Sequence, residues 1–425
     1  MRRLEPFAAP AADGKQAITE LETRLRRFPR ERYPVQHATA QFHLGVALTD
    51  AGRLEAAQDA LRAAAALFGS LRLGAEHAKA LNALGAALRQ ARRCEDAAAA
   101  FARGAEAFAA CGLELERAAA IFNLGLVQRE RGDPLAAVDS LRRARALLGR
   151  DAAPGLAGAA ARELGTALME AGMLEDAVTT LEEAMRLADA AADRVGLAGA
   201  ANALGLAHLG AGRPGAALAA LRTALACHPR SVRPEGHAMV KANLALAHER
   251  AGDAPRARVA ARQALSVSGA DAAVRAQAAA VLERLGDAPG DLLAILDAAP
   301  PEQWTPLLRE ETERLADADD AVRRDEAGAW IDGQLARVDD AVDLCERWLG
   351  ALLELPPEAM EALIRALQQA LAERGPAARE RFEAQTARAV ARFPGPQSDR
   401  LEEAFARIGA EVAAALATMA PRRYM

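Results

Sequence analysis

Residues 124–144 read LGLVQRERGDPLAAVDSLRRA and hold the pattern that decides the fold of this 425-residue chain. A Gly-Asp-Pro turn at residues 132–134 is a stop-and-restart signal, and helical sequence lies on both sides of it. Beyond the turn, Ala137, Leu141 and Ala144 follow one another at helical spacing, so they share one face of a second helix. The stretch therefore predicts a hairpin of two helices.

The Leu-Gly pair that opens this stretch recurs every 40 residues, once as Leu-Ala. The leucines of the six pairs are Leu44, Leu84, Leu124, Leu164, Leu204 and Leu244. A repeat of this length without drift indicates stacked supersecondary units. The small residue of each pair leaves room for a crossing helix, and the leucine or phenylalanine equivalent to Leu141 fills the seam. Because one hairpin cannot bury its own apolar faces, neighbouring hairpins must stack.

The composition favours the same fold and excludes several kinds of partner. Hydrophobic residues make up 52% of the chain, largely as alanine, and aromatic residues only 4%, which suits close helix packing. Strand-like alternation is nowhere sustained, so we predict an all-α fold. A net charge of −5 provides no overall excess of positive charge for binding nucleic acid. No apolar run is long enough to predict a membrane span. Four dispersed cysteines suit a reducing compartment, so we expect a cytoplasmic protein.

The residues of the repeat resemble those of the tetratricopeptide repeat. A small residue with Leu-Gly, a turn glycine, and then Ala, Leu or Phe, and Ala occur at matching offsets, and Pro229 matches that family's closing proline. The period of 40 looks like the long-repeat subgroup seen in kinesin light chains and bacterial signalling arrays. Over roughly residues 36–270, the resemblance implies a right-handed α-solenoid that binds protein or peptide partners in a concave groove.

The chain is predicted to have three parts. Residues 1–35 form an N-terminal segment with a capping helix, and residues 36–290 form the solenoid of six clear repeats and one degenerate repeat. Residues 301–425 form a C-terminal helical bundle or a diverged extension of the solenoid, because the 40-residue period is lost and all three tryptophans lie there. Within this last part we predict one helix over 321–354, with Val338 on its apolar stripe.

The sequence contains no recognised motif for catalysis or for metal or cofactor binding. The chain has no Walker-type phosphate loop, dinucleotide fingerprint, zinc-protease motif or serine-hydrolase elbow. His208 and His248 occupy equivalent places in adjacent repeats and could stack, but without further ligands nearby we interpret them as packing residues. The acidic run that contains Glu310 and Glu311 is predicted to be a solvated helix face. We therefore predict no enzyme, no catalytic or metal site and no cofactor.

The asparagines supply the candidate binding surface. All four lie one or two residues before the leucine of a repeat pair, on the first-helix face that lines the groove in the family that the chain resembles. An asparagine can both donate to and accept from an extended backbone, and basic residues on the same face attract acidic groups. The candidate partner-binding residues are Lys79, Asn82, Arg89, Asn123, Arg129, Arg162, Asn202 and Asn243.

Two interpretations of the asparagines stay open, because they could also brace the neighbouring helix. The family's full charge clamp for C-terminal carboxylates is missing, since His43, Ala83 and Ala203 replace asparagine at one position. We predict a protein–protein interaction scaffold, adaptor or assembly factor that binds a peptide or partner helix, and the arginines of the face favour an acidic partner; the sequence gives no oligomeric state. The alternatives are a peptide-sensing regulatory switch and, less favoured, an enzyme with a site in the C-terminal region near Trp304 or Trp330.

Overall fold

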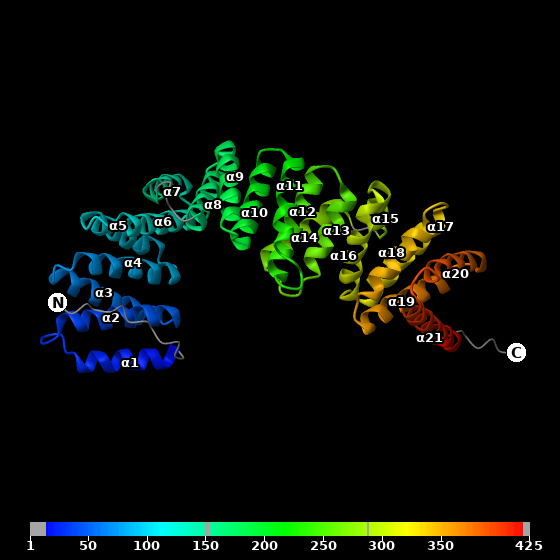
Figure 1. Cartoon of the computed structure of the whole chain (residues 1–425), viewed down its shortest axis with the longest axis horizontal. Helices are drawn as coiled ribbons and strands as arrows, with labels where there is room; N and C mark the ends of the chain where they lie inside the picture. Colours follow the sequence, from blue (N-terminus) through cyan, green and yellow to red (C-terminus); the bar gives the residue numbers. More distant parts are fainter. Residues whose placement is uncertain (1–13, 149–153, 287–288, 420–425) are drawn as a thin grey trace. The chain divides into compact units, whose positions relative to one another are not determined.

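A computed structural model describes residues 14–148, 154–286 and 289–419 (Figure 1). The chain divides into two compact units, one up to Arg213 and the other from Pro214. Every regular element among the described residues is a helix, and the helices pack in series, which confirms the all-α solenoid class. Parts of the predicted N-terminal segment, solenoid and C-terminal region lie outside the described residues. The predicted three-part division of the chain stays a prediction.

The first unit consists of an N-terminal helix followed by helical hairpins. Its helices are α1 (Gly14–Arg27), α2 (Pro34–Asp50), α3 (Leu54–Ser70), α4 (Gly74–Gln90), α5 (Cys94–Ala110), α6 (Glu114–Glu130), α7 (Pro134–Leu148), α8 (Pro154–Glu170), α9 (Leu174–Ala190) and α10 (Arg194–Gly210). Helix α1 packs on α2, and its role as a cap stays a prediction. The even-numbered helices from α2 onward carry the Leu-Gly pairs, and we call α2 to α10 the array.

The hairpins close by matching small residues to large ones. A Cβ atom added at Gly125 would lie 2.7 Å from Cγ of Leu141, and one added at Gly85 would lie 2.8 Å from the ring of Phe101. Glycine is therefore required where the first helix crosses the second, as the sequence predicts. The sixth repeat changes both members together, because Ala245 replaces the glycine and Ala261 replaces the large residue. The array residues thus form tetratricopeptide-like hairpins.

The turn inside each hairpin needs a left-handed backbone. Gly132 and Gly172 have φ of 77° and 76°, and Gly52 has φ of 71°. Arg92 takes the same place in the second repeat with φ of 60°. A side chain in this region costs about 1–2 kcal/mol, so Arg92 is a strained substitute for glycine.

The second unit continues with repeat helices and ends in a different packing. Its helices are α11 (Pro214–Ala226), α12 (Pro234–Arg250), α13 (Ala254–Leu265), α14 (Ala272–Leu285), α15 (Asp291–Ala298), the 3₁₀ turn η1 (Pro301–Gln303), α16 (Trp304–Ala316), α17 (Asp320–Ala336), α18 (Ala341–Leu353), α19 (Pro357–Ala372), α20 (Pro376–Val390) and α21 (Gly395–Met419). Helix α14 is the predicted degenerate first helix. Helices α16 to α21 pack mainly on the helix two places away in the chain, and we call them the C-terminal helices.

The single helix predicted over 321–354 is wrong. Helix α17 ends at Ala336, and α18 begins at Ala341. Arg337 takes an extended conformation, with ψ of 144°, and its guanidinium pairs with Asp297 and Asp340. Val338 consequently lies outside any apolar stripe and is 88% exposed. Charge pairing at Arg337 overrides the apolar periodicity there.

The core of the C-terminal helices is aromatic, unlike that of the array. Trp330 of α17 and Trp348 of α18 stack with ring centroids 5.4 Å apart. The predicted apolar stripe of α19, which includes Leu363, Ile364 and Leu367, is buried. Among the described residues, no helix combines the length and the hydropathy that a membrane span requires.

Candidate functional site

The predicted binding residues of the first unit lie on the first helices of successive hairpins. Lys79, Asn82 and Arg89 are on α4, and Asn123 and Arg129 are on α6. Arg162 follows on α8 and Asn202 on α10. They take this face because the neighbouring leucines turn into the seams. We call the exposed and half-buried part of this set on α4, α6 and α8 the first-helix face.

The four asparagines divide into two pairs by burial. Asn82 and Asn123 are half-buried on the first-helix face, and Oδ1 of Asn82 has no hydrogen-bond partner among the described residues. Asn202 and Asn243 are buried. Oδ1 of Asn243 accepts a hydrogen bond from Nε2 of Gln277 at 2.9 Å, so it braces α12 against α14. The bracing interpretation therefore holds at Asn243, and the amides left for a ligand are those on α4 and α6.

The arginines of the first-helix face pair with carboxylates of the array. Both Nε and Nη2 of Arg89 donate to Oε1 of Glu130, at 2.8 and 2.7 Å, and so link α4 to α6. Arg129 pairs with Glu163 and, at 3.1 Å, with Glu170 of α8. Such pairs between half-exposed groups fix the register of neighbouring hairpins more than they add stability.

Arg162 completes this series of charges. Its Nη2 donates to Oε1 of Glu163 at 2.9 Å. A Cβ at Gly199 would lie 3.0 Å from Nη1 of Arg162, so this side chain reaches across to α10. Burial raises the pKa of Glu170, although the nearby Arg129 opposes the shift. Between α6 and α8 the arginines and carboxylates balance, so that stretch has little net attraction for an acidic partner.

The hollow between α4 and α6 differs, because positive charge is in excess there. It has a volume of about 370 Å³, and its lining residues are Ala86, Arg89, Gln90, Arg92, Phe101, Asn123 and Glu130.

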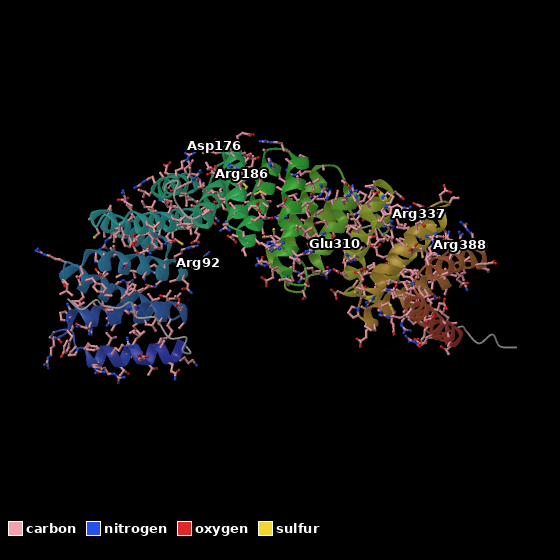
Figure 2. The ribbon with its side chains drawn as sticks, in the orientation of Figure 1. Arg92, Asp176, Arg186, Glu310, Arg337 and Arg388 are labelled. Carbon is pink, nitrogen blue, oxygen red and sulfur yellow. The ribbon has the colours of Figure 1, made fainter. Side chains whose placement is uncertain are left out.

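Two cations on or next to the first-helix face have side chains without a partner among the described residues. The guanidinium of Arg92, which is labelled in Figure 2 and lies in the turn after α4, makes no hydrogen bond or ion pair among the described residues, and neither does the ammonium of the exposed Lys79. The hollow between α4 and α6 thus holds two guanidinium groups, from Arg89 and Arg92, against the single carboxylate of Glu130. With the amide of Asn123 beside them, these groups can hold a carboxylate and hydrogen-bond a peptide backbone.

The acidic run is a solvated face only in part. Asp317, Asp319 and Asp320 are exposed as predicted, whereas the prediction is wrong at Glu310 and Glu311, which are paired inside the second unit. Glu311 is 2% exposed, and its Oε1 lies 2.7 Å from Nη2 of Arg314. Glu310, labelled in Figure 2, pairs with Lys241 of α12, which is 5% exposed. The sequence held one signal for this. Lys241 is the only charged residue at its repeat position, where Leu81, Ile121, Ala161 and Ala201 are apolar and Gln41 is polar but uncharged.

Further buried charges join α13 to the helices that follow it. Asp291 at the start of α15 is 4% exposed and accepts from Arg258 at 2.9 Å and from Arg262 at 2.8 Å. Glu326 of α17 lies 3.5 Å from Nη2 of Arg314 and accepts from the backbone N–H of Gly290. Burial raises the pKa of Glu326. We call these groups, with Lys241 and the acids of α16, the buried charge cluster.

The space beside Trp330 gives no support to a catalytic site. It is lined by Glu311 and Glu326, but its volume is about 30 Å³, which is room for about one water molecule. Both carboxylates are engaged by arginines. Among the described residues, no group of three or more His, Cys, Asp or Glu side chains could hold a metal ion. His208 and His248 are each buried in their own unit, and their stacking stays a prediction.

Comparisons with known proteins find likeness in structure but not in sequence. No family model matches the chain, and no curated protein matches it. YrrB, described as a TPR protein with an unusual peptide-binding site, is 20% identical, with a TM-score of 0.35 over 52% of this chain and 94% of its own. BtubC from P. vanneervenii is 16% identical, with a TM-score of 0.36 over 65% and 94%. The apo form of RapI is 14% identical, with a TM-score of 0.44 over 62% and 90%.

Proposed function

We propose that the chain is a cytoplasmic protein–protein interaction scaffold, adaptor or assembly factor that binds a peptide segment of its partner on the first-helix face. The hollow between α4 and α6 is the observation that carries the proposal. It places an excess guanidinium group beside the amide of Asn123, on the face where successive hairpins present polar side chains. Repeat arrays recognise partners through many shallow contacts of this kind.

The proposed partner segment carries an acidic group at this hollow. Arg89 is already paired with Glu130, whereas the guanidinium of Arg92 has no partner among the described residues. Arg129 and Arg162 are likewise paired with carboxylates, so they contribute register and shape more than charge. The acidic preference of the face therefore depends mainly on Arg92 and on the exposed Lys79, and it weakens as salt is raised.

Site-specific photo-crosslinking tests this proposal in native cell extract. A photoreactive residue replaces Ala86, which lines the hollow, or Arg103, which is exposed on the second helix α5 of the same hairpin. The proposal predicts a discrete crosslinked partner from position 86 and none from position 103. The Arg92→Glu variant should lose that partner, whereas Arg103→Glu should retain it. Equal crosslinking at both positions, or retention by Arg92→Glu, would overturn the proposal.

A further inference from the structure

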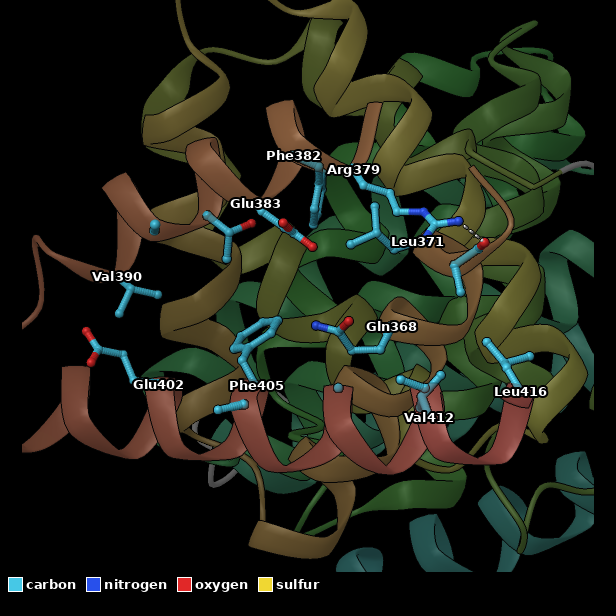
Figure 3. A pocket seen from close by; sticks show the side chains of 16 residues that line it. Gln368, Leu371, Arg379, Phe382, Glu383, Val390, Glu402, Phe405, Val412 and Leu416 are labelled. Carbon is cyan, nitrogen blue, oxygen red and sulfur yellow. Dashed lines mark hydrogen bonds between the residues drawn. The ribbon is translucent and has the colours of Figure 1, made fainter. Parts of the chain in front are cut away.

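A groove lies between α20 and α21 in the second unit. We propose that this C-terminal groove, lined by Leu371, Phe382, Ala387, Phe405, Ala406, Gly409, Ala413 and Leu416, binds an amphipathic helix of a partner protein. The partner helix presents bulky apolar side chains to the groove and basic side chains to its rim. The groove has a volume of about 770 Å³, and Figure 3 shows its walls.

The groove exists because two consecutive helices part from each other. Helix α20 packs mainly on α18, and α21 packs mainly on α19, so α20 and α21 meet only slightly. Phe382 and Val390 of α20 and Val412 of α21 are buried at its inner side, and Gln368 of α19 lies between the two helices in Figure 3. The groove is therefore open towards solvent, and its base is mainly apolar, with the polar side chains of Gln368 and Thr386 within it.

The consecutive helices α17 and α18 provide a comparison in which the space between two helices is filled. Helices α17 and α18 also meet only slightly, but the stacked rings of Trp330 and Trp348 fill the space beside them, leaving about 30 Å³. The C-terminal groove has no such filling. It is lined by Phe382 and Phe405 together with small residues, which are Ala387, Ala406, Gly409 and Ala413, and its volume is about 770 Å³. Large apolar side chains from another molecule can take the place that the tryptophans take between α17 and α18.

The length of the groove selects a helix over a compact small molecule. Its lining along α21 runs from Glu402 to Leu416, which at the rise of an α-helix is about 21 Å, or about four turns. Ala406 and Ala413 are two turns apart on one exposed stripe. Small residues in such a stripe allow the close helix approach that Gly85 and Gly125 allow in the array.

The charges at the rim select a basic partner. Glu383 makes no hydrogen bond or ion pair among the described residues, and Glu402 accepts only from Ser398 at 3.3 Å. Arg379 is the cation of the rim, but its Nε and Nη2 donate to the carbonyl oxygens of Arg374 and Ala372 at 2.8 and 2.7 Å. The carboxylates are therefore left to attract lysine or arginine side chains that flank the apolar face of the partner helix.

Two designed helical peptides of about four turns, with the same leucine-rich stripe, test this proposal on the full chain. One peptide carries lysines and the other glutamates beside the stripe, and binding is followed by fluorescence anisotropy. The lysine peptide should bind, and at least about tenfold more tightly than the glutamate peptide. The double variant Glu383→Arg/Glu402→Arg should reverse that order. If neither peptide binds, or if charge reversal changes nothing, the proposal is overturned.

A matched pair of alanine substitutions locates the binding. Ala406→Trp fills the groove, whereas Ala410→Trp places the same ring on an exposed position of α21 that does not line it. Only Ala406→Trp should weaken the lysine peptide, by at least about tenfold. Equal effects of the two variants would contradict the proposal. Light scattering measures the molar mass of the chain as a further check. If the chain is a dimer and Ala406→Trp makes it a monomer, a second copy of the chain occupies the groove, and the proposal of a partner helix is overturned.

Discussion

The array and the C-terminal helices reach all-α packing by different means. In the array, glycine or alanine on one helix meets leucine or phenylalanine on the next, and the pattern returns every 40 residues. In the second unit, the buried charge cluster joins α12 and α13 to α15, α16 and α17, and the helices from α15 onward share an apolar core that contains the stacked Trp330 and Trp348. Packing by size needs only local spacing, whereas packing by charge needs partners that are brought together by the fold.

The largest effect is expected where the buried charge cluster is broken. Asp291→Ala leaves Arg258 and Arg262 buried without their carboxylate and should destabilise the second unit by about 3–5 kcal/mol. Denaturant unfolding measures the loss. Asp320→Ala is the control, because Asp320 pairs with Arg323 but its own side chain is 88% exposed, and it should cost much less. Equal costs for the two variants would remove the distinction between the two kinds of packing.

Acid should weaken the second unit through His248. Burial lowers the pKa of His248 from 6.5 to about 4, and the nearby Asp253 opposes the shift. In the unfolded chain, His248 is protonated below about pH 6.5, whereas in the folded chain it stays neutral down to about pH 4. The free energy of unfolding therefore falls as the pH drops through this window. The loss is at most about 3 kcal/mol. His248→Asn should flatten the pH dependence of the unfolding midpoint between those limits, and an unchanged slope would contradict the assignment.

A smaller effect of opposite sign is expected at Arg92 in the array. Arg92→Gly relieves a left-handed backbone and should stabilise the chain by about 1 kcal/mol. The mirror substitution Gly132→Arg, at the equivalent turn, should destabilise it by a similar amount. Thermal unfolding of both variants checks the pair. If both changes shift the melting temperature in the same direction, backbone strain is not what distinguishes the two turns.

The array could be predicted from sequence because each seam depends on residues at fixed offsets. Gly125 and Leu141 belong to one hairpin, and their fixed spacing in the sequence predicts that they are in contact. The candidate site was predicted less completely. Arg89 and Arg129 lie on the expected face, but their pairing with Glu130 and Glu170 depends on how far side chains reach between hairpins.

The second unit shows the limit of the same reasoning. Lys241 and Glu310 are far apart in the sequence, and only the packing of α16 against α12 brings them together. At the helix break after Ala336, Arg337 pairs with Asp297. Apolar periodicity cannot predict such a pair. Lys241, a charged residue at a repeat position that is mostly apolar, was the one local sign that a partner with the opposite charge exists elsewhere.

A double-mutant cycle at Gly125 and Leu141 tests most directly the central claim that the array packs by matched size. Gly125→Ala alone should cost about 1–3 kcal/mol, because its new methyl group meets Leu141. In the Leu141→Ala background, which imitates Ala245 and Ala261 of the sixth repeat, the same change should cost little or stabilise the chain. Denaturant unfolding should therefore give a coupling energy above about 1 kcal/mol. Additive costs would contradict the account.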